Sequence, residues 1–284
     1  AGGAGGLAKP SETVTDRRLT PANGRVAALH LAGQVTADRY LAGQPMMLTR
    51  PVSDLCAAPA QARDRQLLLG AVVTVFEDRD GWSFVQAVDG YVGYVASDRL
   101  GAVQEATHMV GTMATHAYLA EDMKSRDVMA LPFGARVTVV DERAKFFETT
   151  LGYVPKKHLR PLDRPFTDPA TVAQLHFGVP YLWGGNSTRG IDCSGLVAAA
   201  FGACAIPCPA DSDLQCAGLG ADFTGPAQRG DLIFWQGHVA MMVDDATLIH
   251  ANAHHMATAY EPLEAARLRI AAQGGGPVTA RRRI

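Results

Sequence analysis

GIDCSGLVAAAF, residues 190–201, places one cysteine at the start of an apolar run that is typical of a buried helix. Asp192 is a residue type that favours the N-cap position, so the helix is predicted to begin at Cys193. Unpaired backbone N–H groups and the positive end of the helix dipole favour a thiolate in this first turn. Cys193 is therefore a candidate nucleophile.

Two histidines follow on a predicted hairpin, in the segment GDLIFWQGHVAMMVDDATLIHAN at residues 230–252. Its apolar runs VAMMV and TLIHA are separated by two aspartates, which is a turn signal. With the turn centred near residue 244, His238 is predicted to lie directly opposite His250, with Cβ atoms roughly 4.5–5.5 Å apart. His238 would act as general base and acid for Cys193, and His250 would orient His238.

Each of these residues also has a structural interpretation. A single cysteine at a helix start is more often a small buried side chain, and a single strand histidine is usually a satisfied polar group. Three independent structural residues would not be expected to match this order and spacing. The combination therefore favours catalysis by Cys193, His238 and His250.

Five motifs of the C-terminal part occur in a fixed order: YLWGG (181–185), DCSGLV (192–197), RGDLIFW (229–235), GHVAMM (237–242) and LIHAN (248–252). Together they resemble the NlpC-type cell-wall cysteine peptidases, papain-like enzymes that cut peptidoglycan stem peptides. The resemblance implies a catalytic triad of Cys193, His238 and His250 and amide hydrolysis through a thioester acyl-enzyme.

The catalytic domain is expected over residues 164–284. A helix near 167–177, the helix at Cys193 and a run of strands from about 231 to 260 predict a small α+β domain with helices on one side of an antiparallel sheet. Trp183 is expected to form part of the wall beside the nucleophile.

Composition limits the alternatives. A formal charge of −2 over 284 residues argues against nucleic acid as an electrostatic partner. No stretch approaches the 18 uninterrupted apolar residues of a membrane span. Five cysteines, an odd number, do not suggest a disulfide framework, so a reduced, cytoplasmic location is predicted. A periplasmic or secreted location stays open, because a signal peptide could already have been removed.

The first residues, AGGAGGLAKP, are interpreted as a flexible leader. Together with residues up to 50 they are expected to form a leader and an arm or linking helix across the domains. The chemistry of this region and the oligomeric state are left open.

The sequence between residues 50 and 163 repeats itself. LGAVVTVFED (69–78) is echoed by FGARVTVVDE (133–142) at an offset of 64, and GYVGYVASDRL (90–100) by LGYVPKKHL (151–159) at an offset of 59. Alternating β-branched residues and glycine turns predict two small all-β barrels, over 51–105 and 106–163. They resemble bacterial Src-homology-3-like domains, which commonly accompany NlpC-type catalytic domains.

A subset of that family, the γ-D-glutamyl-L-diamino acid endopeptidases, carries further motifs that match here. An Asp-Ser pair 18 residues beyond the cysteine is matched by Asp211 and Ser212. An acidic residue and a tyrosine of the first barrel are matched by Asp64 and Tyr91. The resemblance implies that these residues bind the free amino group of the substrate's L-Ala. A buried ammonium needs such acceptors to offset its desolvation.

The remaining motifs allow other assignments. The residues Cys204, Cys208, Cys216, His254 and His255 lack the paired spacing of a zinc site, so no metal or cofactor is expected. The expected partner is a small peptide, a murein tripeptide or tetrapeptide. A wall-tethered hydrolase of intact peptidoglycan, a thiol acyltransferase and a non-catalytic wall-binding protein are the alternatives, although the last would need a broken triad.

Overall fold

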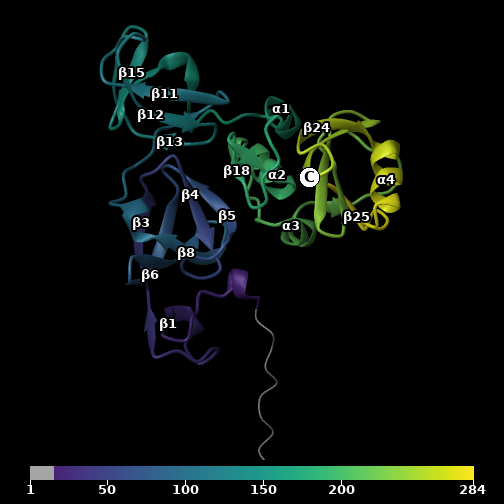
Figure 1. Cartoon of the computed structure of the whole chain (residues 1–284), viewed down its shortest axis with the longest axis horizontal. Coiled ribbons are helices and arrows are strands. Elements are labelled where there is room, and N and C mark those ends of the chain that lie inside the picture. The colour runs from purple at the N-terminus through teal and green to yellow at the C-terminus, as the bar shows by residue number, and fades with distance from the viewer. Residues whose placement is uncertain (1–15) are drawn as a thin grey trace, which may run out of the picture.

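A computed structural model describes residues 16–284, and the fold is given for this part of the chain. Two all-β units are followed by a unit of helices and strands, and both β units lie on one side of that C-terminal unit (Figure 1). Among residues 16–284, no helix combines the length and the apolar character that crossing a membrane requires.

Residues 16–43 form a small attachment to the first β unit. Its elements are the short 3-10 turn η1 (Arg17–Leu19), β1 (Val26–Ala28), η2 (Leu29–Leu31) and β2 (Arg39–Leu41). Strands β1 and β2 pair in parallel, and Val26 and Ala28 pack against aromatic side chains of the first β unit. The sequence analysis expected an arm or a linking helix here, and the structure has a pair of short strands instead. The expected leader, residues 1–10, lies outside the described residues.

The first β unit is a seven-stranded antiparallel sheet with the order β5-β4-β8-β7-β6-β3-β9. Its elements are β3 (Gln44–Leu48), β4 (Val52–Cys56), β5 (Arg63–Leu68), β6 (Val72–Arg79), β7 (Trp82–Ala87), β8 (Val92–Ala96), η3 (Ser97–Arg99) and β9 (Leu100–Gly101). Strand β3 pairs with β6 and β9, so the unit includes residues 44–48, ahead of the boundary expected at residue 51.

The second β unit repeats this arrangement in two sheets, with the orders β12-β11-β16-β15-β14 and β13-β10-β17. Its elements are β10 (His108–Val110), β11 (Ala114–Tyr118), β12 (Asp127–Pro132), β13 (Arg136–Val137), β14 (Val139–Glu142), β15 (Phe146–Thr149), β16 (Gly152–Pro155), η4 (Lys156–His158) and β17 (Leu159–Pro161). The neighbours match those of the first unit strand for strand, so the sequence repeat is also a structural repeat.

Equivalent glycines mark the repeat. Gly70 and Gly134 have φ of +78° and +81°, a region that favours glycine, and each precedes a strand. At Gly70 the two units also touch, because a Cβ there would lie 2.5 Å from the carbonyl oxygen of Arg136. The amide of Arg136 donates to the carbonyl of Leu69 at 2.9 Å. The two β units therefore pack directly on each other.

The C-terminal unit is built on a six-stranded sheet with the order β20-β25-β21-β22-β23-β24. Its elements are α1 (Pro169–Leu175), β18 (Asn186–Ser187), β19 (Gly190–Ile191), α2 (Cys193–Ala203), α3 (Ser212–Gly218), β20 (Ala221–Asp222), β21 (Leu232–Trp235), β22 (His238–Met242), β23 (Thr247–Asn252), β24 (Ala257–Pro262), α4 (Leu263–Ala272) and β25 (Ala280–Arg283). The predicted helix near 167–177 and the helix at Cys193 are confirmed by α1 and α2.

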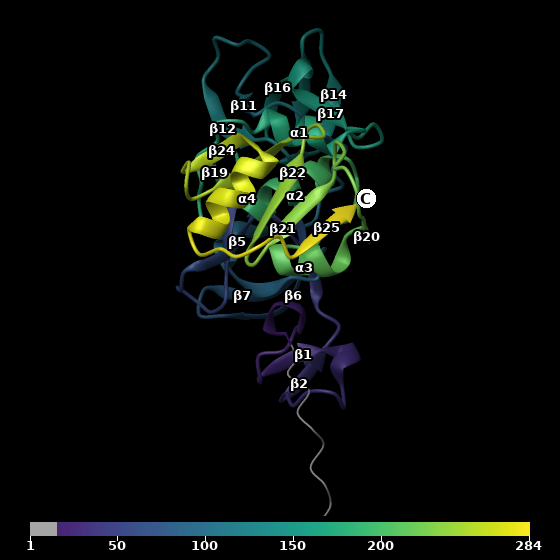
Figure 2. The same cartoon turned by 90° about the vertical axis from the view of Figure 1, so that its right-hand side faces the viewer.

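Helices cover both faces of this sheet. One apolar core joins α1 and α2 to alternate strand residues such as Phe234 and Met241, and a second joins α4 to Trp235 and Met242. Figure 2 shows α4 lying across the face that is turned to the viewer. The expectation of helices on one side only was wrong, because all four residues of β21 are buried and both faces need an apolar cover.

The β units share apolar cores with the C-terminal unit. Ala210 and Leu214, at the start of α3, pack into the core of the first β unit, which also contains Tyr91. Met109 and Phe133 of the second β unit pack into the core around α1 and α2. The first set of contacts fixes the first β unit beside α3, and the second set fixes the second β unit beside α1 and α2.

Candidate active site

Cys193 is the first residue of α2, and the segment before it is tied down by Asp192. Oδ1 of Asp192 accepts the backbone N–H of Gly195 at 2.7 Å, which confirms the predicted N-cap. Oδ2 accepts the N–H of Gly184 at 2.9 Å, so the same carboxylate holds the YLWGG segment against the helix. Gly195 permits this approach, because a Cβ there would lie 2.3 Å from the carbonyl oxygen of Gly185.

The thiol of Cys193 is more deeply buried than expected, with 8% of the residue exposed. Burial raises its pKa to about 12 and the charge of Asp192 adds to the rise, whereas the backbone N–H groups of Val239, Ser194 and Cys193 itself lower the pKa. Desolvation therefore opposes the N–H groups of the helix start, which were predicted to favour a thiolate.

His238 and His250 lie on adjacent strands, β22 and β23, and their rings are in contact. Nε2 of His238 lies 2.9 Å from Nδ1 of His250. The register pairs Met241 with Ile249, so His238 is diagonal to His250 and not directly opposite, as had been predicted. The displacement is two residues, and because side chains alternate along a strand both rings stay on the same face.

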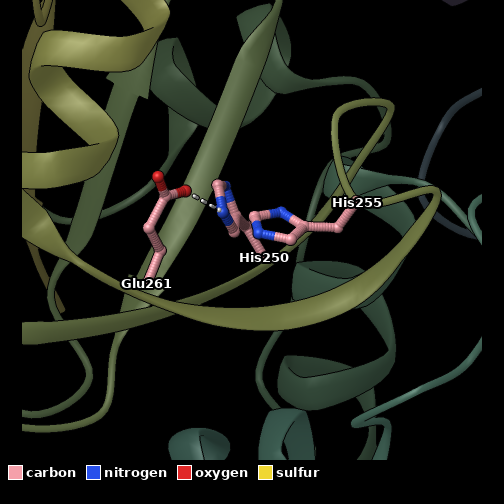
Figure 3. Close-up of side chains that lie close together, drawn as sticks. All are labelled: His250, His255 and Glu261. Carbon is pink, nitrogen blue, oxygen red and sulfur yellow. Dashed lines mark hydrogen bonds and ion pairs between the residues drawn. The ribbon is translucent and has the colours of Figure 1, made fainter.

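Glu261, on strand β24, extends this arrangement beyond the three predicted residues. Its Oε2 lies 3.1 Å from Nε2 of His250 (Figure 3). Both carboxylate oxygens also accept hydrogen bonds from Arg269 on α4. Arg269 lowers the pKa of Glu261, which is thereby held as a carboxylate. In the structure His250 pairs with Ala259, which places Glu261 one diagonal step away on the neighbouring strand.

These contacts define which ring nitrogens carry protons. Burial lowers the pKa of His238 to about 4 and that of His250 to about 3, so both imidazoles are neutral near pH 7. A carboxylate only accepts, so Nε2 of His250 donates to Glu261 and its Nδ1 accepts from Nε2 of His238. The tautomer assigned in this way leaves Nδ1 of His238 as the nitrogen that can take a proton.

Tyr181, in the YLWGG motif, is a further residue beside the nucleophile to which the sequence analysis gave no role. Burial raises its pKa to about 12, because a phenolate would lose its hydration and would lie near Cys193 and Asp192, whose ionised forms disfavour it. The phenol therefore stays protonated near Cys193. A neutral hydroxyl near the nucleophile can donate a hydrogen bond to the oxyanion that forms on a carbonyl oxygen when the sulfur attacks the carbonyl carbon.

One group among residues 16–284 has the composition of a metal site. Ligand atoms of His250, His255 and Glu261 lie within 4.8 Å of one another (Figure 3). Glu261 already accepts from Arg269 through both oxygens, and Nδ1 of His255 lies 2.9 Å from Oδ1 of Asn252. The adjacent guanidinium opposes a cation, so the donor set fits a hydrogen-bonded relay better than a metal site.

The residues expected to bind the substrate's amino group meet at the contact between the first β unit and α3. The hydroxyl of Tyr91 donates to Oδ2 of Asp211 at 3.1 Å. Burial raises the pKa of Tyr91, as do the nearby charges of Asp211 and Asp64. Asp211 has φ of +59°, and within the described residues its side chain makes no capping hydrogen bond to α3, which begins at Ser212.

The structure also places two arginines of the N-terminal attachment against the acidic pocket, the cluster formed by Tyr91, Asp211 and Asp64. Nη1 of Arg18 lies 2.8 Å from Oδ2 of Asp211, and Nη2 of Arg17 lies 2.8 Å from Oδ2 of Asp64. Sequence reasoning missed them, since about 190 residues separate Arg18 from Asp211. The pocket is thus acidic and contains cations of the same chain.

Two contacts connect the acidic pocket to the nucleophile. Gln215, one turn along α3 from Asp211, donates to the carbonyl of Ser194 at 2.9 Å. Gly184 approaches Asp64, since a Cβ at Gly184 would lie 2.7 Å from the Asp64 carbonyl oxygen. Trp183 is 74% exposed, and its backbone carbonyl accepts a hydrogen bond from Nε of Arg63 at 3.0 Å.

Comparisons with known proteins match both parts of this site. Residues 55–100 match the bacterial dipeptidyl-peptidase SH3 domain, and residues 178–267 match the NlpC/P60 family. A gamma-D-glutamyl-L-lysine dipeptidyl-peptidase of Bacillus cereus is 26% identical over 226 residues, 68% of this chain and 68% of that protein. Dipeptidyl-peptidase 6 of Lysinibacillus sphaericus is 24% identical over 214 residues, 66% of this chain and 79% of that protein.

A solved structure shows the same fold. An NlpC/P60 family protein from Bacillus cereus superposes with a TM-score of 0.72 at 20% identity, over 84% of this chain and 99% of that chain. The two domain matches and this common fold confirm the resemblance expected from the five motifs. The chain joins a dipeptidyl-peptidase-type SH3 domain to an NlpC/P60 domain, and it is a cysteine peptidase.

Proposed function

We propose that the chain hydrolyses the amide bond between γ-linked D-Glu and a diamino acid in short peptides that begin with a free L-Ala. The observation that carries this proposal is the hydrogen bond of Tyr91 to Asp211, which closes an acidic pocket between the two matched domains. The two relatives whose names describe dipeptidyl-peptidases support it, because each match covers about two thirds of this chain.

The proposed chemistry begins from a neutral thiol and a neutral imidazole. The sulfur of Cys193 attacks the amide carbonyl while Nδ1 of His238 takes the thiol proton, and the phenol of Tyr181 donates to the oxyanion. The C–N bond then breaks and the leaving amine takes the proton from His238. Water attacks the thioester with His238 as base, which releases the peptide acid and restores the thiol.

The acidic pocket provides the proposed specificity for a free N-terminus. An ammonium that leaves water loses its hydration, and Asp211, Asp64 and the oxygen of Tyr91 can replace it. An acylated nitrogen has no charge and adds bulk, and it would leave the carboxylates without a partner. A pocket of this kind selects short peptides over intact peptidoglycan, whose L-Ala nitrogen is in an amide bond.

We propose peptide recycling in the cytoplasm as the role that follows from this specificity, on tripeptides or tetrapeptides. The second β unit is proposed to be a further Src-homology-3-like copy, since its strand order repeats that of the first. In this proposal the first copy forms a specificity wall and the second packs against the catalytic core through Phe133.

The proposal is tested with three substrates: free L-Ala-γ-D-Glu-L-Lys, its N-acetylated form and intact sacculi, with products identified by mass spectrometry. We expect release of L-Ala-D-Glu from the free tripeptide and little turnover of the other two. Cys193→Ala is the control for activity that does not come from this site. Equal rates on the free and acetylated tripeptides would contradict the proposed specificity.

A further inference from the structure

Arg18 occupies the pocket that the proposed function assigns to the substrate's ammonium. Its Nη1 lies 2.8 Å from Oδ2 of Asp211, the same oxygen that accepts the hydroxyl of Tyr91. Its Nη2 lies 2.6 Å from Oδ2 of Asp213. A guanidinium is a cation with several donors, so it satisfies the same acceptors that an α-ammonium would need.

Arg18 is held in place for this contact. Asp16 accepts from the backbone N–H of Arg18 at 2.9 Å and from its Nη2 at 2.7 Å, and the neighbouring Arg17 pairs with Asp64. The side chain of Arg18 is 23% exposed. Asp16, Asp64, Asp211 and Asp213 therefore share the guanidiniums of Arg17 and Arg18. Removal of these two arginines would leave the four carboxylates without the cations that pair with them.

Charged contacts, and not apolar packing, hold this part of the attachment. Arg17 and Leu19 are exposed and Arg18 is half-buried, whereas apolar burial in the attachment begins only at Pro21 and Val26. Ion pairs near a protein surface exchange partners at low cost, while a buried apolar anchor does not. Residues 16–20 can therefore leave the pocket while the strands that follow stay packed on the first β unit.

We propose that Arg18 is a specificity-determining residue of the amine subsite, which it fills until a substrate that carries its own cation replaces it. The inference rests on the proposed function and adds an intramolecular competitor to it. A free N-terminal ammonium leaves Asp211 paired when it displaces Arg18. An acetylated N-terminus cannot do so, because it offers no positive charge in exchange.

The competitor predicts an effect that depends on substrate charge. Apparent affinity falls in proportion to the fraction of protein whose site is open, so removal of Arg18 should raise that fraction. Arg18→Ala should lower KM for free L-Ala-γ-D-Glu-L-Lys by about five- to tenfold, which corresponds to an open fraction of roughly 10–20% in the unchanged protein. The acetylated tripeptide can bind only with its N-terminus outside the subsite that Arg18 fills, so it does not compete with Arg18 and its KM should not fall. The value of kcat should stay within about twofold.

Two variants accompany this measurement in the full-length chain. Arg18→Lys keeps the charge but cannot bridge Asp211 and Asp213 with two nitrogens, so its KM should be intermediate. Arg25→Ala is the matched control, because Arg25 belongs to the same attachment but pairs with Glu77, outside the pocket. Its KM should equal that of the unchanged protein.

Binding of the same two peptides to Cys193→Ala protein, with and without Arg18→Ala, is measured by calorimetry and needs no turnover. Tighter binding of the free tripeptide alone supports the inference even if the proposed cleavage is not found. Weaker binding of the free tripeptide would show that Arg18 contributes to the subsite instead of competing for it, and this result would overturn the inference. Equal gains for both peptides would also overturn it, since they would indicate a steric cover that ignores charge.

Discussion

His250 lies with its Nε2 3.1 Å from Oε2 of Glu261, on the side of the ring away from His238. Because Arg269 keeps Glu261 ionised, this contact determines the tautomer of His250 and, through it, that of His238. His238 is thus oriented by two residues in series. In the proposed mechanism Glu261 is a positioning residue and not a member of the reacting set.

Glu261→Gln should lower kcat by about tenfold or more, because an amide can present either a donor or an acceptor to His250 and no longer specifies one tautomer. The measurement is kcat and KM on the free tripeptide, with circular dichroism to verify the fold. KM should change little, since Glu261 is remote from the acidic pocket. Glu264→Gln, an exposed change on the neighbouring helix, is the control.

An unchanged kcat in Glu261→Gln would show that packing alone orients His250. A rise in KM without a change in kcat would also contradict the relay, because it would place Glu261 in substrate binding.

Stability should decrease with acid over a window set by the two histidines. Burial lowers the pKa of His238 to about 4 and that of His250 to about 3, whereas in the unfolded chain both titrate near 6.5. Between these values the unfolded state binds protons that the folded state does not, so stability is fully present above pH 6.5 and is lost as pH falls towards 4. Thermal unfolding followed from pH 7.5 to pH 4.5 measures this loss.

The matched variant for this prediction is His250→Asn, which removes one of the two titrating groups. The midpoint temperature of thermal unfolding of this variant should fall less steeply over the same pH range. A midpoint that does not change between pH 7 and pH 5 in the unchanged protein would contradict neutral burial of the two rings.

Alkylation should report the protonation state of Cys193. Burial raises the pKa of this thiol to about 12, so the rate of labelling by iodoacetamide should rise steadily with pH above 7 and show no plateau near neutrality. Mass spectrometry of labelled peptides separates Cys193 from the other four cysteines, which are also free in the described residues. A pH-independent rate between pH 6 and pH 8 would instead indicate a resting thiolate–imidazolium pair.

Tyr181→Phe tests the proposed donor to the oxyanion. Loss of one such donor commonly costs about a hundredfold or more in kcat, with little change in substrate binding. Because the substitution removes only the hydroxyl, the half-buried ring keeps its packing against the core around α2. Single-turnover acylation by an activated γ-D-Glu ester is the direct measurement. Acylation at the unchanged rate would exclude this role for the phenol.

The sequence predicted what depends on local pattern. Asp192 as N-cap, the helix at Cys193 and the equivalent glycines of the repeat all follow from residue types within a few positions of one another. The hairpin register was wrong by two residues. The amide of Val243 donates to the carbonyl of Thr247, so the turn is centred on residue 245 and not 244. An even displacement keeps both histidines on one face, which is why the pairing of the rings was still found.

What the sequence could not predict depends on distance along the chain or on burial. The contact between Arg18 and Asp211 joins the first helical turn of the described chain to the third helix of the catalytic domain. The pKa of Cys193 depends on how completely the surrounding core excludes water, and the first turn of a helix carries no information about that. The last strand, β25, has the sequence ARRR and was missed because its arginines pair with Asp231 and Asp222 instead of alternating with apolar residues.

Asp211→Asn tests the acidic pocket through a difference between two substrates. The amide keeps a hydrogen-bond acceptor for Tyr91 but removes the charge that pairs with an ammonium. On the free tripeptide kcat/KM should fall by about two orders of magnitude, at about 1.4 kcal/mol for each factor of ten. On the acetylated tripeptide, which brings no cation, the loss should be much smaller, so the preference of the unchanged enzyme for the free amine should largely disappear.

Tyr91→Phe and Asp64→Asn separate the parts of the pocket in the same assay. Tyr91→Phe removes the hydrogen bond to Asp211 but leaves the charge, so it should cost less than Asp211→Asn on the free tripeptide. Asp64→Asn removes a carboxylate that attracts a cation, and it also frees Arg17, a competing cation, from its ion pair. Loss of the carboxylate should weaken the binding of a cation, whereas departure of Arg17 should strengthen it. The contrary result is that all three variants lower kcat/KM by the same factor on both peptides. That result would show that these residues stabilise the contact between the first β unit and α3 and do not recognise the charge of the substrate.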